Sequence, residues 1–153
     1  MNNNDIIRRI RYIFDLSDDT MIKIFESAEY QTTRSEVSDW LKKDDDPDQI
    51  KLHDIKLATF LNGFINHKRG KREGEQPKPE KRLTNNLILR KLKIALAYKD
   101  IDMLKAFEAA EFEISKHEIS AFFRKPTQRQ YRECKDQFLR NFLFGLQKIY
   151  RED

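Results

Sequence analysis

The chain of 153 residues has one cysteine, four glycines, four prolines and no long apolar run. Its single thiol, Cys134, cannot form an internal disulfide, and we expect a reducing, cytoplasmic setting. The scarcity of glycine and proline argues against a turn-rich all-β fold. The apolar runs are too short to cross a bilayer, and the first residues, MNNNDIIRRIRYIF, lack a signal-peptide cleavage pattern. We therefore expect no membrane segment and no secretion signal.

Residue types that build catalytic and metal sites are also scarce. The three histidines, His53, His67 and His117, form no pair four residues apart, and there is no second cysteine. A zinc site is therefore not expected. No glycine-rich phosphate loop and no nucleophile with a neighbouring base stands out. The sequence predicts no cofactor and offers no candidate catalytic residue for an enzyme.

What the chain does have is an internal repeat. Residues 3–69 align without a gap with the residues 82 positions later, and 20 of the 67 pairs are identical. Unrelated segments would share about four. We infer a tandem duplication, with one helical copy at 1–69 and the other at 85–153. Residues 70–84, GKREGEQPKPEKRLT, hold two of the glycines and two of the prolines and are expected to form an exposed, charged linker.

Each copy reads as four helices, so the expected fold is all-α, with two tandem homologous four-helix units. Apolar residues recur at helical spacing from Ile6 and from Ile88, and we expect the preceding Asn4 and Asn86 to cap these first helices. The second helices should begin near residues 18 and 100. The fourth should run over about 50–67 and 128–150.

The second and third helices of each copy form a helix-turn-helix-like hairpin. The third helix starts at a capping box, Thr33-x-x-Glu36 in one copy and Ser115-x-x-Glu118 in the other. We interpret both glutamates as helix-start residues. A helix that reads DNA needs exposed basic or amide side chains near its start, and here acidic residues stand among them. The pattern is equally typical of an ordinary helical hairpin.

Several repeated positions are interpreted as packing residues. Gly63 and Gly145 lie inside the fourth helices, where glycine is unfavourable, so we expect a close helix contact at each. Trp40 and the phenylalanines recur at helical spacing and should form the core. Cys134 aligns with Leu52 and is expected to be a small core residue.

Charge is distributed unevenly between the copies. Residues 3–67 hold 9 Lys and Arg against 13 Asp and Glu, whereas residues 85–151 hold 14 against 8. The imbalance fits complementary association, within a chain or between chains, and it also fits a basic surface for nucleic acid. A merely solvated, unevenly charged surface is the third possibility. The candidate nucleic-acid-binding residues are Lys116, Arg124, Lys125, Arg129 and Arg132.

The segments NNDIIRRIRYIFDLSDDTMIKIFE, SEVSDWLKK and FLNGFI, with their second versions NNLILRKLKIAL, DMLKAFEAAE and FLFGL, closely resemble the YehS-like bacterial proteins. Those proteins are built from two copies of a domain of unknown function (number 1456). The resemblance covers essentially the whole chain and implies a cytosolic bacterial protein. It implies no activity, cofactor or site residue. Our leading hypothesis is a non-enzymatic interaction or regulatory module acting through a protein or self-association surface, and the alternative is nucleic-acid binding.

Overall fold

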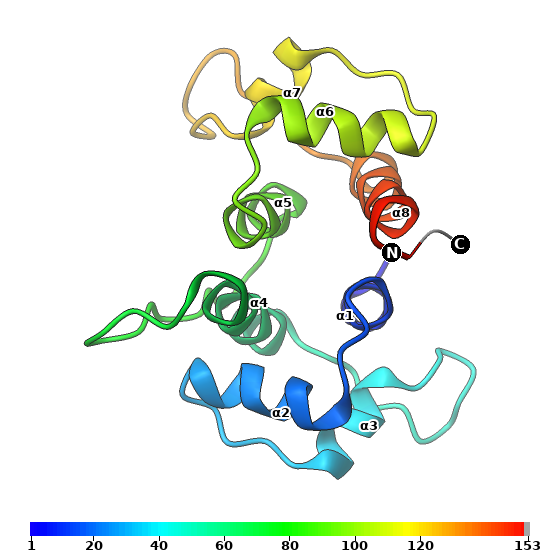
Figure 1. Ribbon diagram of the computed structural model, residues 1–153, viewed down its shortest axis with the longest axis vertical. Coiled ribbons are helices and arrows are strands. Elements are labelled where there is room, and N and C mark those ends of the chain that lie inside the picture. The colour runs from blue at the N-terminus through cyan, green and yellow to red at the C-terminus, as the bar shows by residue number, and fades with distance from the viewer. Residues whose placement is uncertain (152–153) are drawn as a thin grey trace. The chain divides into compact units, whose positions relative to one another are not determined.

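The computed structural model describes residues 1–151, and within that range it holds eight helices and no strand (Figure 1). The chain separates into two compact units, Met1–Leu83 and a second that begins at Thr84. The first contains α1 (Asn3–Ile13), α2 (Asp18–Ser27), α3 (Arg34–Leu41) and α4 (Asp54–Arg69). The second contains α5 (Asn85–Ala95), α6 (Asp100–Ala109), α7 (Lys116–Phe122) and α8 (Asp136–Arg151). The predicted all-α fold of two four-helix units is confirmed.

Aromatic rings form the centre of the first unit's core. The ring of Phe25 lies 5.3 Å from that of Trp40 and 5.4 Å from that of Phe60, and all three side chains are buried. Burying such a side chain contributes about 1.5–3 kcal/mol. In the second unit, Phe107 and Phe142 repeat the contact at 5.6 Å. The interpretation of these residues as core is confirmed.

Asn4 and Asn86 do not cap helices, contrary to the prediction. The residues that cap α1 and α5 are Asn2 and Thr84. Asn4 is buried; its Nδ2 donates to the carbonyls of Trp40 and Ile50, at 2.8 and 2.9 Å, and its Oδ1 accepts from the N–H of Leu52. An asparagine side chain suits this position because its amide can donate two hydrogen bonds and accept another. It thereby pairs backbone carbonyls and a backbone N–H that no regular secondary structure pairs.

Asn86 makes the same three bonds in the second unit. Its Nδ2 donates to the carbonyls of Phe122 and Arg132, and its Oδ1 accepts from the N–H of Cys134, all within 3.0 Å. These bonds hold residues 42–53 and 123–135 as loops. The fourth helices consequently begin later than predicted, at 54 and 136.

A close crossing of two helices requires glycine in each unit. A Cβ added to Gly63 would lie 2.7 Å from the carbonyl carbon of Ile24 on α2. One added to Gly145 would lie 2.6 Å from the carbonyl carbon of Ala106 on α6. Carbon atoms normally approach to about 3.5–4.0 Å, so no larger residue fits without separating the helices. The close contact predicted at both glycines is confirmed.

Four helices end with a non-glycine residue in the left-handed conformation, at Asp15, Glu29, Ala97 and Glu111. At the end of α2, the next N–H, that of Tyr30, donates back to the carbonyl of Phe25. This is a Schellman ending, usually made with glycine. Its recurrence at equivalent positions of both units shows that the turns were duplicated together with the helices.

The segment that follows α4 lies against the first unit. Gln76 is buried, and its Oε1 accepts from Asn66 at 3.2 Å. The N–H of Leu83 donates to the carboxylate of Asp54 at 2.9 Å. These contacts belong to residues 70–84, for which the sequence predicted a linker. Within residues 1–151, no helix combines the length and the apolar character needed to span a membrane.

Candidate partner-binding groove

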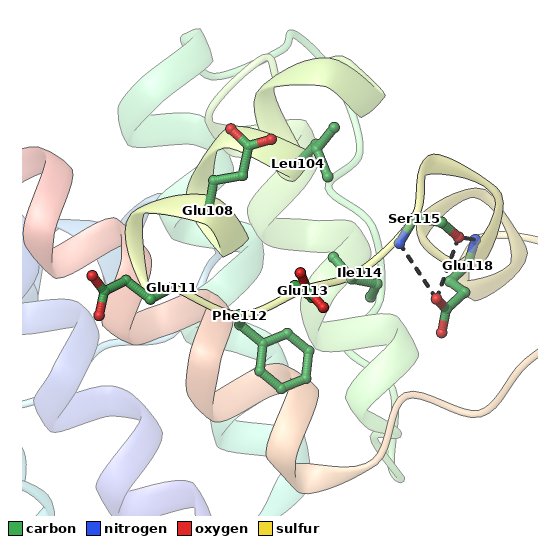
Figure 2. A pocket seen from close by; sticks show the side chains of 8 residues that line it. All are labelled: Leu104, Glu108, Glu111, Phe112, Glu113, Ile114, Ser115 and Glu118. Atoms are coloured by element: carbon green, nitrogen blue, oxygen red, sulfur yellow. Dashed lines mark hydrogen bonds between the residues drawn. The ribbon is translucent and has the colours of Figure 1, made fainter.

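A groove of about 740 Å³ lies beside the hairpin of α6 and α7 in the second unit (Figure 2). Its apolar side chains are half-buried, Glu108, Glu111 and Glu113 are exposed, and Glu118 is bonded to Ser115 (Figure 2). The lining residues are Leu104, Glu108, Glu111, Phe112, Glu113, Ile114, Ser115 and Glu118. The sequence predicts only a turn between helices in this stretch.

The turn that shapes the groove is fixed by the end of α6. Glu111 has a φ of 56°, and the N–H of Phe112 donates back to the carbonyl of Phe107 at 3.0 Å. The ring of Phe112 then packs 5.8 Å from that of Phe107 and 5.7 Å from that of Phe138. The apolar part of the groove is therefore anchored to the core and does not depend on a mobile side chain.

The far wall is fixed by the start of α7. Ser115 Oγ accepts from the N–H of Glu118 at 3.1 Å, and Glu118 Oε1 accepts from the N–H of Ser115 at 3.3 Å, which confirms the predicted capping box. Glu118 Oε2 accepts from Arg132 Nη1 at 2.7 Å. The guanidinium of Arg132 also lies 5.3 Å from the ring of Phe138.

The equivalent positions of the first unit are chemically different. There Glu36 accepts from the hydroxyl of Tyr30 at 2.8 Å and from that of Thr32 at 2.6 Å. Lys56 Nζ lies 3.8 Å from the centre of the Tyr30 ring. Burial, together with the bond to Glu36, raises the pKa of Tyr30. The hydroxyls hold Glu36, so only the Thr33 hydroxyl half of the predicted capping box is formed.

In the second unit Phe112, Ile114 and Phe138 stand where the first has Tyr30, Thr32 and Lys56. Two hydroxyls and one ammonium are thus replaced by apolar groups. Glu113 also replaces Gln31. A comparison of the two copies at these aligned positions is the signal by which sequence analysis could have found the groove.

The candidate nucleic-acid residues do not all lie together. Arg124, Lys125 and Arg129 lie on the loop between α7 and α8, whereas Lys116 is the first residue of α7. Arg132 is on the same loop but pairs with Glu118. Glu113 and Glu118 stand on either side of Lys116 in the chain. Acidic groups beside the start of α7 disfavour insertion of this helix against phosphates.

Arg124 lines a second, smaller hollow of about 340 Å³. Lys93 lies in the same hollow, paired with Asp100 at 3.2 Å and placed 4.7 Å from the centre of the Phe123 ring. The ion pair already supplies a counter-charge to Lys93. Of the candidate residues on the loop, Lys125, Arg129 and Arg132 are exposed, whereas Arg124 is half-buried.

The equivalent loop of the first unit carries the opposite charge. It contains Asp44, Asp45, Asp46 and Asp48, where the second unit has Pro126, Thr127, Gln128 and Gln130. Asp44 accepts hydrogen bonds from the side chains of Gln49 and Asn2, and these bonds lower its pKa. Each loop is held by the hydrogen bonds of one buried asparagine, Asn4 or Asn86, which we call the asparagine bracket. The two loops nevertheless present surfaces of opposite charge.

Cys134, the last residue but one of the 123–135 loop, is buried, with 1% of its surface exposed. Burial raises the pKa of its thiol to about 12. A thiol in this state is a poor nucleophile at neutral pH. The interpretation of Cys134 as a core residue is confirmed. Among residues 1–151, no group of His, Cys, Asp and Glu side chains could hold a metal ion.

Comparison with known proteins agrees with the duplication. A family model described as "Protein of unknown function (DUF1456)" matches twice, at residues 3–70 and 85–152. The "Uncharacterized protein YehS" of Escherichia coli (strain K12) is 40% identical over 147 residues, which is 95% of this chain and 94% of that protein. No solved structure matches.

Proposed function

The chain belongs to the DUF1456 family, whose description names no activity, and on the evidence of the groove we propose that the protein is a non-enzymatic interaction module. Its second unit binds another polypeptide between α6 and α7. The observation that carries this proposal is the combination of a preformed hollow, an apolar floor and a charged rim. Such a combination is the usual composition of a binding surface for a peptide segment.

The difference between the two copies supports the same proposal. Tyr30 and Thr32 of the first unit are joined to Glu36 by hydrogen bonds. Their counterparts Phe112 and Ile114 have no polar group to satisfy. Apolar side chains at a half-exposed surface gain free energy when a partner covers them.

A nuclear magnetic resonance titration tests the proposal. The full chain, labelled with ¹⁵N and ¹³C-methyl groups, is titrated with three 12-residue probe peptides that share a leucine stripe and carry lysine, glutamine or glutamate elsewhere. We expect at least one probe to shift the methyl signals of Leu104 and Ile114. The matched control is Ile22, which aligns with Leu104 in the first unit and should not shift.

A second copy of the chain is one candidate partner. The loop with four aspartates in the first unit and the basic loop in the second would attract each other between molecules. Light scattering after size-exclusion chromatography, at low and at high salt, tests this form of the proposal. A strict monomer in both conditions rules out self-association and leaves a different protein as the partner.

Nucleic-acid binding is the second candidate function, and the charge of the 123–135 loop favours it. Arg124, Lys125 and Arg129 would contact phosphates, with Lys116 and Arg132 nearby in sequence. Fluorescence anisotropy with labelled random duplex DNA and single strands should then show affinity that falls with salt. Absence of binding at low salt contradicts this function.

We also propose a cytoplasmic location. Cys134 is a free, buried thiol and the single cysteine of the chain, which suits a reducing compartment. Cell fractionation with a compartment marker tests the location.

A further inference from the structure

We propose that the groove selects a partner segment that combines positive charge with an apolar anchor, and that Arg132 is an internal competitor for one of its four carboxylates. This inference rests on the proposed function and specifies the partner of that site. It follows from the negative charge of the residues that line the groove and from the ion pair between Arg132 and Glu118.

The rim of the groove is acidic and largely unpaired. Glu108, Glu111 and Glu113 are exposed, and among residues 1–151 no hydrogen bond or ion pair engages their carboxylates. All three line the same groove as Leu104 and Ile114, and Glu108 and Glu113 lie nearer to these two side chains than Glu111 does (Figure 2). When an apolar side chain of the partner occupies the groove, a neighbouring lysine or arginine of the partner can pair with one of these three carboxylates. An acidic partner segment would be repelled by them.

The fourth carboxylate shows which group the rim accepts. Glu118 Oε2 accepts from Arg132 Nη1 at 2.7 Å, with 47% of the arginine side chain and 34% of the glutamate side chain exposed. Arg132 comes from the loop and not from a groove-lining element. A basic partner must therefore either displace Arg132 from Glu118 or bind without a contact to the Glu118 carboxylate.

This competition gives one substitution opposite effects under the two candidate functions. Arg132→Gln frees Glu118, so a basic segment should bind the groove more tightly. If the protein instead binds a polyanion through the 123–135 loop, the same substitution removes a phosphate contact and weakens binding.

The experiment measures dissociation constants of fluorescein-labelled 12-residue peptides with the full-length chain at low salt. Four probes are used: leucine with lysine, leucine with glutamine, leucine with glutamate, and serine with lysine. We expect the leucine–lysine peptide to bind at least fivefold more tightly than each of the other three. Its advantage should shrink at high salt, because exposed charge pairs are screened.

Two variants and one control test the role of Arg132. We expect Arg132→Gln to tighten binding of the leucine–lysine peptide roughly twofold to fivefold, the range of one exposed ion pair. Glu113→Gln should weaken it by a similar factor. Lys125→Gln removes the same charge from the same loop without touching the groove and is the matched control. Equal gains in Arg132→Gln and Lys125→Gln would show a net-charge effect and overturn the competitor role.

The outcomes separate this inference from the proposed function. If the leucine–glutamine peptide binds as tightly as the leucine–lysine peptide and shifts Leu104 and Ile114, the groove is a binding site but its basic selectivity is wrong. If no peptide shifts these methyl groups at about 1 mM, where binding would be worth only about 4 kcal/mol, the proposed function itself is overturned.

Discussion

The helix crossing at Gly145 offers the most direct test of the fold. In Gly145→Ala the new Cβ would lie 2.6 Å from the carbonyl carbon of Ala106 and closer still to its oxygen, so α6 and α8 must separate by more than about 1 Å to restore a normal contact. Alanine gains up to about 1 kcal/mol over glycine in helix propensity. Overpacking costs about 1–3 kcal/mol, and a separated interface also loses about 0.8 kcal/mol for each CH₂ uncovered. We expect a net loss of about 2 kcal/mol in the free energy of unfolding.

Urea denaturation followed by two signals locates the effect. The chain has one tryptophan, Trp40, which is buried in the first unit, so its fluorescence reports on that unit, whereas circular dichroism reports on all helices. Gly145→Ala should lower the midpoint of the dichroism transition, and Gly63→Ala should lower the fluorescence midpoint.

Lys105→Ala on α6 is the control, because Lys105 is exposed and its substitution should change stability by no more than about 0.5 kcal/mol. A Gly145→Ala protein as stable as the original, or more stable, would refute the inferred backbone contact.

Three further predictions concern the hydrogen bonds of Asn86, the left-handed turn at Ala97 and the carboxylate of Asp54. Asn86→Ala leaves the carbonyl of Phe122 at the end of α7 and two backbone groups of the 123–135 loop without their partner, and it should cost at least about 2 kcal/mol. It should also speed labelling of Cys134 by a thiol reagent, which the buried, high-pKa thiol otherwise resists. Ala97→Gly should raise the free energy of urea unfolding by about 0.5 kcal/mol, because glycine removes the strain of a φ of 55° but adds freedom to the unfolded chain; no gain would contradict the left-handed turn. The hydrogen bond from the N–H of Leu83 lowers the pKa of the Asp54 carboxyl group. The carboxylate therefore stabilises the fold at pH values above its unfolded pKa of about 3.9, and this contribution is lost as pH falls through the folded pKa. Asp54→Asn should therefore show a shallower loss of stability in acid, measured by tryptophan fluorescence.

Periodic and repeated features of the fold could be predicted from the sequence. The 82-residue repeat, the second helices at Asp18 and Asp100 and the close contacts at Gly63 and Gly145 are all found in the structure. Each follows from a local rule: helical spacing, a cap, or the cost of glycine inside a helix. The family resemblance is also confirmed by the two matches along the chain.

Features that depend on distant residues could not be predicted. Asn4 resembles a helix cap in sequence, yet it bonds residues 36 and 48 positions away and thereby delays the start of α4. The groove is a different case, because its lining residues all lie within 104–118. Glu108 and Glu111 are repeated in both copies, so the sequence signal is the loss of polar groups at Phe112 and Ile114.

The asparagine brackets have an evolutionary consequence. Asn4 and Asn86 bond only main-chain atoms, of the loops and of Trp40 and Phe122 just before them, so these bonds impose no side-chain identity on the loops. After the duplication, one loop could become acidic and the other basic without loss of the scaffold. The same freedom makes residues 43–49 and 125–131 natural grafting points, at which new recognition sequences can be introduced into either copy independently.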